Sequence, residues 1–257
     1  MSLFEQYVAF MTILRKEIKR FLRIWTQTLL PSAITMSLYY LIFGTLIGSR
    51  IGEMGGRTYM EFVVPGLIMM AIVTNSYSNV VSSFFGAKFN HSVEELLVSP
   101  IPNYVILWGY VAGGVSRGLL VAFIVTLVSL FFTSFHIAHF GVVVAVVILT
   151  SVLFALCGFI NAVYANTFDD ISIVPTFVLT PLTYLGGVFY SLDLLPEFWA
   201  KVSQINPLVY VVNAFRYGML GVSDVSVGFA FAMIGVFLVL AYSYSMHLLR
   251  SGTRLRA

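Results

Sequence analysis

Charged residues are absent from long, regularly spaced stretches of this sequence, and this pattern constrains the fold more than any other feature. Runs of 26, 26, 22 and 25 uncharged residues follow Arg23, Glu61, Asp170 and Asp224. A fifth run, of 51 residues, is divided by the polar segment 133–139. A helix needs about 20 mainly apolar residues to cross the hydrocarbon core, and a charge at its centre is costly. The sequence therefore predicts six membrane-crossing helices.

We expect the chain to be an all-α membrane protein in a single transmembrane domain, 1–257. Of its 257 residues 59% are hydrophobic and 10% charged, and the mean hydropathy is +0.94, so most of the chain is suited to lipid. Six crossings leave no room for a soluble catalytic domain, which usually takes about 100 residues. The domain is expected to comprise an interfacial helix (1–27), a six-helix bundle (28–249), an outer segment (191–227) and a tail (250–257). The crossings are placed at 29–47, 62–84, 104–132, 142–165, 171–190 and 228–249.

Basic residues predict the orientation, because Lys and Arg are enriched in cytoplasmic segments. With the amino terminus inside, nine basic residues fall on the inner side and four on the outer side. Both termini are therefore predicted to lie in the cytoplasm, with the chain in the inner membrane. The inner set is Arg15, Lys16, Lys19, Arg20, Arg23, Lys88, Arg250, Arg254 and Arg256, and the outer set is Arg50, Arg57, Lys201 and Arg216.

The segment before the first crossing has the pattern of an amphipathic helix that lies on the inner leaflet. Arg15, Lys16, Lys19 and Arg20 share one arc of a helical wheel with Arg23. Two interpretations stay open: a topology anchor held by anionic membrane lipid, or a helix that also docks a cytoplasmic partner. The apolar arc consists of Leu3, Tyr7, Phe10, Met11, Leu14, Ile18, Phe21, Leu22 and Trp25.

The inner loop 86–103 is predicted to contain a short helix. Ser92 and Glu95 have the spacing of a capping box, and Pro100 prevents the helix from continuing. The helix would combine acidic with apolar side chains, a mixture suited to contacting a soluble protein; a solvated connector is the alternative. The expected coupling residues are Ser92, Glu94, Glu95, Leu96 and Leu97.

The outer segment 191–227 contains more aromatic residues than a simple hydrophilic loop. Pro196 and Pro207 interrupt it, and side chains such as Trp199 and Phe215 would be costly in water. Its apolar pieces are too short to cross, so we expect short helices that re-enter the outer leaflet. A gate over an exit path is one use of such helices, and a structural plug is the other.

Arg117 is the one basic residue well inside a predicted crossing. Intramembrane charge marks a functional site by default, but a long crossing would also let this side chain snorkel to the inner head groups, the interpretation we favour. Four glycines around it have small-xxx-small spacing and predict close packing against another helix. These glycines are Gly109, Gly113, Gly114 and Gly118.

The sequence predicts no catalytic, cofactor-binding or metal-binding residue. The Walker A pattern is missing, and the single Cys157 excludes an internal disulfide. Nucleic acid is not expected as a partner. Three function classes remain: a transporter driven by a separate ATPase, a secondary transporter that uses an ion gradient, and a membrane scaffold. Few intramembrane carboxylates argue against proton coupling.

An ordered set of short motifs near the carboxyl half carries a family resemblance. They are Phe168-Asp169-Asp170, Pro181-Leu182-Thr183-Tyr184-Leu185-Gly186-Gly187-Val188-Phe189-Tyr190, Leu194-Leu195-Pro196, Asn206-Pro207-Leu208-Val209-Tyr210 and Ala214-Phe215-Arg216. With them the full chain resembles the membrane subunit of type-2 ABC exporters, in particular the YadH-like branch. The stretch Glu94-Glu95-Leu96-Leu97-Val98-Ser99-Pro100 resembles the family's inner coupling loop.

The resemblance implies a homodimer of permease subunits that works with two copies of a separate ATP-binding cassette protein. ATP and Mg would bind that partner and not this chain. An amphiphilic substrate, such as a drug, lipid or saccharide-like molecule, would move outward between the permease halves by alternating access. The residues expected to form the outer gate are Pro181, Gly186, Gly187, Phe189, Tyr190, Pro196, Asn206, Pro207, Tyr210 and Arg216.

Overall fold

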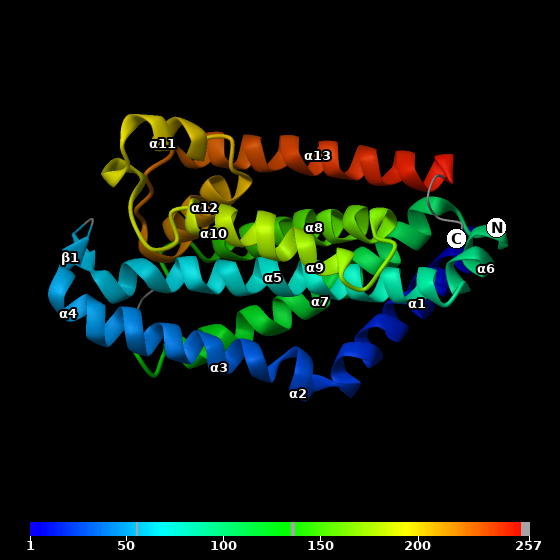
Figure 1. Cartoon of the computed structure of the whole chain (residues 1–257), viewed down its shortest axis with the longest axis horizontal. Coiled ribbons are helices and arrows are strands. Elements are labelled where there is room, and N and C mark those ends of the chain that lie inside the picture. Colours follow the sequence, from blue (N-terminus) through cyan, green and yellow to red (C-terminus); the bar gives the residue numbers. More distant parts are fainter. Residues whose placement is uncertain (55, 135–136, 253–257) are drawn as a thin grey trace.

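The computed structural model describes residues 1–54, 56–134 and 137–252, and its described part is almost entirely helical (Figure 1). Arg254 and Arg256 lie outside the described residues. The long helices are α1 (Leu3–Arg23), α5 (Tyr59–Phe89), α7 (Asn103–Ser129), α8 (Phe140–Tyr164) and α13 (Val227–Ser251). Between α1 and α5 lie α2 (Trp25–Thr28), α3 (Leu30–Tyr39), the π-helix η1 (Tyr40–Ile47), α4 (Gly48–Ile51) and the antiparallel strands β1 (Glu53–Met54) and β2 (Arg57–Thr58). The shorter elements are α6 (Ser92–Val98), α9 (Asp170–Val174), the π-helix η2 (Pro175–Leu179), α10 (Thr180–Tyr184), the 3-10 helix η3 (Leu192–Leu194), α11 (Glu197–Ser203) and α12 (Pro207–Leu220).

Five of the described helical segments are long and apolar enough to cross a membrane, which confirms an all-α membrane protein. The first, Trp25–Ile51, runs from α2 to α4 and contains the expected crossing at 29–47. The other four are α5, α7, α8 and α13, whose ends lie within five residues of the expected crossings at 62–84, 104–132, 142–165 and 228–249. The uncharged runs therefore locate these five helices correctly.

The expected crossing at 171–190 differs from the structure. Only 170–184 is helical, in three consecutive five-residue elements (α9, η2 and α10), or 15 residues in all. Such a length rises about 22 Å, less than the roughly 30 Å of the hydrocarbon core. The prediction of a continuous helix to Tyr190 is wrong because the chain turns at Gly186 and Gly187, where Gly187 has a φ of 73°. Glycine adopts this left-handed backbone without steric cost.

Helix α5 forms the centre of the bundle. Its most apolar 18-residue window is 78% buried, against 17% for the corresponding window of α13. It packs against α7, α8 and α12. Contact with α8 is close because Gly158 carries no side chain: a Cβ there would lie 2.5 Å from the Tyr77 carbonyl oxygen. The more exposed apolar faces of α3 and α13 are suited to lipid.

The two ends of the bundle carry different elements (Figure 1). The start of α1, helix α6 and the end of α13 lie together at one end, which we call the α6 end. Strand β1, helix α4 and helix α11 lie at the opposite end, which we call the α11 end. The predicted inner and outer segments are thus at opposite ends of the same bundle.

Helix α1 is docked on the bundle and does not only lie on a membrane surface. Ile13, Glu17 and Phe21 are buried, while many of the apolar residues of α1 stay exposed. A Cβ on Gly109 would lie 2.6 Å from the Ile13 side chain, and one on Gly113 would lie 2.5 Å from that of Glu17. The glycine spacing in α7 therefore predicted close helix packing correctly, and α1 is one of the helices that use it.

Candidate functional site

The loop before α7 does contain a short helix, α6, but the expected capping box is wrong. The helix begins at Ser92, which leaves the preceding His91 in the cap position with a φ of 58°. The Ser92 hydroxyl donates to the Ala87 carbonyl at 3.1 Å and does not cap the α6 amides. Because Ser92 lies one residue too far into the helix to be the cap, Glu95 cannot complete a box with it.

Helix α6 presents a mixed surface at the α6 end. Glu95 is exposed, and Glu94 is partly exposed and pairs with His91 at 3.3 Å. Leu96 and Leu97 are partly buried against the bundle, so they hold the helix in place. The surface that α6 offers is therefore mainly its acidic residues and the apolar residue Val98, which is 83% exposed.

The basic residues expected to couple α1 to a partner divide into two groups. Arg15, Lys16 and Lys19 are exposed, and the Lys16 ammonium lies 5.7 Å from the centre of the Tyr110 ring. Arg20 instead turns toward α5, where it donates to the backbone oxygen of Asn79 at 2.8 Å and to its side-chain oxygen at 2.9 Å. Arg20 thus binds within the chain, which leaves three exposed basic residues on α1.

Glu17 is a buried carboxylate that the sequence reasoning missed. It is fully buried, accepts from the Ser83 hydroxyl at 2.5 Å and pairs with Arg20 at 3.3 Å. Arg20 in turn binds Asn79. The spacing of Glu17 from Leu14 and Phe21, both in the apolar arc, was the available signal, because residues three and four apart share a helix face.

Arg117 does not snorkel, so the interpretation favoured from the sequence is wrong. The residue is 9% exposed. Its guanidinium donates to the Asn75 side-chain oxygen at 2.9 and 3.2 Å and to the Thr28 carbonyl at 3.0 Å. The Asn75 amide donates to Ser32 at 2.9 Å. These neutral acceptors hold the guanidinium inside the bundle.

The two networks share one face of α5. Asn75, Asn79 and Ser83 are spaced by four residues, so they lie on successive turns. Asn75 binds Arg117, and the other two bind Arg20 and Glu17. We call these six residues, Glu17, Arg20, Asn75, Asn79, Ser83 and Arg117, the polar seam. It joins α1 and α7 to the central helix through hydrogen bonds.

A small cavity of about 210 Å³ lies between α5 and the broken helix 170–184. Its wall mixes hydroxyl and apolar groups. The lining residues include Met70, Thr74, Tyr77, Ser78, Leu179, Thr180 and Thr183. Such a wall can contact an amphiphilic molecule through both polar and apolar atoms.

The residues expected to form the outer gate gather at the turn after α10 and at the start of α12. Asn206 caps α12 by accepting from the Leu208 amide at 2.9 Å, and it donates to the Leu182 carbonyl at 2.6 Å. The Tyr210 hydroxyl donates to the Gln204 carbonyl at 2.5 Å. Asn206 therefore ties the end of one expected gate segment to the start of the other.

The remaining gate residues occupy distinct places. Gly186 and Gly187 are buried in the turn, whereas Pro181 is exposed at the start of α10. Pro196 is the exposed residue that precedes α11, and the partly buried Pro207 opens α12. Tyr190 is partly buried, and Phe189 packs on an aromatic cluster that also holds Tyr39, Phe43 and Tyr184.

Arg216 is the centre of the gathered group at the α11 end. Although it was expected among the outer basic residues, its side chain is 1% exposed. Its Nη2 donates to the Gly187 carbonyl at 2.6 Å, and its Cζ lies 3.8 Å from the centre of the Phe62 ring. Asp224 pairs with Nη1 at 3.8 Å and accepts from the Leu192 amide at 3.0 Å. We call Phe62, Gly187, Leu192, Arg216 and Asp224 the Arg216 cluster. It connects α5, α12 and both segments that flank α11.

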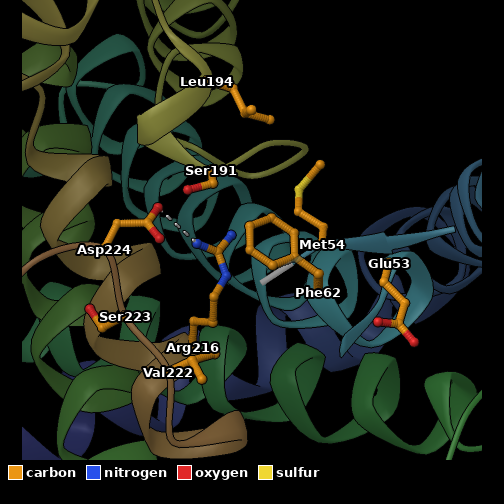
Figure 2. Close-up of a pocket in the computed structure, with 9 residues that line it drawn as sticks. All are labelled: Glu53, Met54, Phe62, Ser191, Leu194, Arg216, Val222, Ser223 and Asp224. Carbon is orange, nitrogen blue, oxygen red and sulfur yellow. Dashed lines mark ion pairs between the residues drawn. The ribbon is translucent and has the colours of Figure 1, made fainter. Parts of the chain in front are cut away.

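A cavity of about 400 Å³ opens beside the Arg216 cluster (Figure 2). The guanidinium lies between the Phe62 ring and the Asp224 carboxylate, while the Glu53 carboxylate points away from it. Among the described residues no group of three or more His, Cys, Asp or Glu side chains is arranged to hold a metal ion. The polar groups that line this cavity are an arginine, an aspartate, two serine hydroxyls and Glu53, whose carboxylate points away from the arginine.

The fold is that of a multi-helix membrane protein, and comparison with known proteins identifies its class. The family described as ABC-2 type transporter matches residues 8–220. The chain belongs to this family. It is therefore a multi-pass membrane subunit of an ABC transporter and not itself an enzyme, and members of the family generally work with a separate ATP-binding cassette subunit.

Named relatives agree with this assignment. The chain is 57% identical over 251 residues to the inner membrane transport permease YadH of Escherichia coli K12, covering 98% of each chain. It is 25% identical over 217 residues to nodulation protein J of Sinorhizobium fredii, covering 83% of this chain and 81% of the relative. The corresponding protein of Rhizobium leguminosarum is 22% identical over 214 residues, with 83% of each chain covered.

Proposed function

We propose that this chain forms the translocation path of an ATP-driven exporter for an amphiphilic substrate, in the inner membrane. The observation that carries the proposal is the exposed acidic surface of α6, at the end of the bundle where α1 begins, in a chain of the ABC-2 family; α1 adds three exposed basic residues. This surface could bind a soluble ATPase whose own surface combines charged and apolar side chains. ATP and Mg would bind that ATPase, because this chain carries no Walker A pattern.

The broken helix 170–184 is the proposed sixth crossing. Its 15 helical residues are too short to cross by themselves, so the turn 185–190 completes the passage. Irregular backbone at membrane depth must be buried in protein or line a cavity. The contacts of Gly187 and Phe189 with Arg216 and Tyr59 meet this condition. In this arrangement α11 and α12 are the re-entrant helices of the outer segment.

A homodimer is the proposed working unit with two ATPase copies. The broken helix exposes the hydroxyl-bearing Thr176 and Thr180 next to Phe177, which is 74% exposed. Together with the cavity between this helix and α5, these residues form a mixed surface that a second copy can cover. The substrate would then move between two such surfaces, one from each subunit.

Energy would pass from the ATPase to the substrate path by rigid-body tilting. Closure of the ATPase dimer would push α6 and α1, and α1 is bonded to α5 through the polar seam. Helix α5 also contacts the Arg216 cluster through Phe62. Movement at the α6 end can therefore reach the α11 end through one continuous helix, which is the basis for alternating access.

Affinity purification tests this proposal most simply. The tagged chain, extracted in mild detergent from its own cells, should retain an ATP-binding cassette protein in equal number, identified by mass spectrometry. A scaffold or a secondary transporter would retain none. Absence of such an ATPase from preparations that keep the homodimer intact would contradict the proposal.

Cysteine labelling tests the proposed orientation, with both termini in the cytoplasm. Single cysteines at Ser226 and Ser251 lie at opposite ends of α13. The first should react with membrane-impermeant maleimide from outside, and the second only after permeabilisation. Cys157 is replaced by Ser in both variants so that only the added thiol reports. Labelling of Ser251→Cys from outside in intact cells would reverse the assigned orientation.

A further inference from the structure

The charged pair in the Arg216 cluster is held slightly too far apart for a direct hydrogen bond. Nη1 of Arg216 lies 3.8 Å from Oδ2 of Asp224, whereas N–H···O hydrogen bonds span about 2.7–3.2 Å. Within the described part of the chain, Nη1 and Nε have no hydrogen-bond partner although both are buried. Buried donors without acceptors are costly, and the cost is larger for charged groups. An oxygen atom from outside the chain, placed beside this pair, would give Nη1 the acceptor that it lacks.

A hydroxyl group satisfies both sides of this gap. Seated beside the gap on the cavity side, its oxygen can accept from Nη1 of Arg216 while its proton is donated to Asp224. A phosphate or carboxylate would bring its negative charge against Asp224, and an ammonium would bring its positive charge against Arg216. The opposite charges of this pair therefore favour a neutral ligand that both donates and accepts.

The rest of the cavity suits a ligand with several hydroxyl groups and apolar C–H surface. Ser191 and Ser223 contribute hydroxyls to the wall, and Met54 and Val222 contribute apolar surface (Figure 2). The volume of about 400 Å³ is within the range of small-molecule sites, about 300–1,000 Å³. Sugars present hydroxyls at their edges and C–H groups on their faces, so they match this wall.

We propose that the cavity beside Arg216 and Asp224 binds a polyhydroxylated group, the sugar of a saccharide or of a glycolipid. The hydroxyl nearest the gap bridges the arginine and the aspartate, and the sugar face lies against Met54 and Val222. The site is at the α11 end, where α11 lies nearby. Binding here does not depend on the proposed export function, because it requires neither an ATPase nor transport.

Hydrogen exchange in lipid nanodiscs tests the site. The full chain is placed in nanodiscs with glucosyl-diacylglycerol, with diacylglycerol, or with free maltose, and amide exchange is followed at 187–194 and 222–225. The glycolipid should slow exchange in both segments, and plain diacylglycerol should not. Protection by maltose as well would assign a soluble saccharide as a ligand, whereas protection by the glycolipid alone would assign a lipid head group.

Asp224→Asn is the informative variant. It keeps an oxygen that can accept from the Leu192 amide but removes the charge that receives the ligand hydroxyl, so the apparent dissociation constant should rise about tenfold. Glu197→Gln is the matched control, because this exposed carboxylate on α11 lies outside the cavity lining and should leave binding unchanged. No protection by either sugar would mean a water-filled cavity only. That result, equal protection by diacylglycerol, or unchanged affinity in Asp224→Asn would overturn the proposal.

Discussion

Two buried arginines are held in different ways in two parts of this protein. Arg117 in α7 is bound by neutral acceptors, the side-chain oxygen of Asn75 and the carbonyl of Thr28. Arg216 in α12 is bound by a carbonyl, an aromatic ring and the carboxylate of Asp224. Neutral acceptors can be exchanged at modest cost, while separating a buried opposite charge is expensive. The comparison indicates that the Arg216 cluster holds its segments firmly and that the surroundings of Arg117 can rearrange.

The largest effect is expected from Arg216→Ala. The change leaves the Asp224 carboxylate uncompensated, so stability should fall by about 3–5 kcal/mol. Reversible unfolding in mixed detergent micelles measures the loss. Arg57→Ala is the control, because Arg57 is exposed and its bond to the Leu220 carbonyl is long, at 3.5 Å. If the double variant Arg216→Ala with Asp224→Ala lost as much stability as the two single variants together, the two residues would not act as a pair.

Arg117→Ala should cost less, about 1–3 kcal/mol. The substitution leaves the Asn75 side-chain oxygen and the Thr28 carbonyl without this donor. Both groups are neutral, so no buried charge is left unpaired. The same unfolding assay compares the variants directly. Asn75→Ala should lose at least as much stability, because it leaves the buried Arg117 guanidinium with only the Thr28 carbonyl as an acceptor. A loss for Arg117→Ala that equals the loss for Arg216→Ala would remove the distinction between the two arginines.

Gly113→Ala should have the smallest of these effects on the whole bundle, about 1 kcal/mol. Its Cβ would lie 2.5 Å from the Glu17 side chain, so α1 must shift outward from α7. Hydrogen exchange should therefore speed up in α1 and stay unchanged in α12. Gly235→Ala is the control, because no atom lies within 4 Å of a Cβ there and alanine favours a helix. Unchanged exchange in α1 would show that its docking does not depend on this contact.

The sequence predicts helices here better than it predicts contacts. Runs without charge locate five crossings because lipid imposes the same length and polarity on each of them. The end of the broken helix 170–184 could not be located in this way. The turn at Gly186 and Gly187 that follows it carries no charge, so the uncharged run continues past the end of the helix. Arg117 was misplaced for a related reason. Its acceptors lie 42 and 89 residues away, so only the folded bundle shows that they reach it.

The candidate site was predicted in part. The motif order led to Arg216, Gly187 and Asn206, and the structure brings these expected gate residues close to the turn after α10. Asp224 was not singled out, because a lone carboxylate in an outer loop is ordinary in sequence and becomes distinctive only beside a buried arginine. Glu17 was overlooked because it lies among the five basic residues of α1, although its spacing from the apolar arc could have shown that it faces the bundle.

ATP hydrolysis by purified preparations tests the central claim, that this chain draws its energy from a separate ATPase docked at the α6 end. The chain alone should show no hydrolysis, and the complex with its co-purified ATPase should hydrolyse ATP. Glu94→Ala combined with Glu95→Ala should weaken the complex or uncouple hydrolysis from transport, while the unfolding free energy of the bundle stays the same. Hydrolysis by a preparation of this chain shown to be free of other proteins, or full assembly and transport by the double variant, would contradict the account.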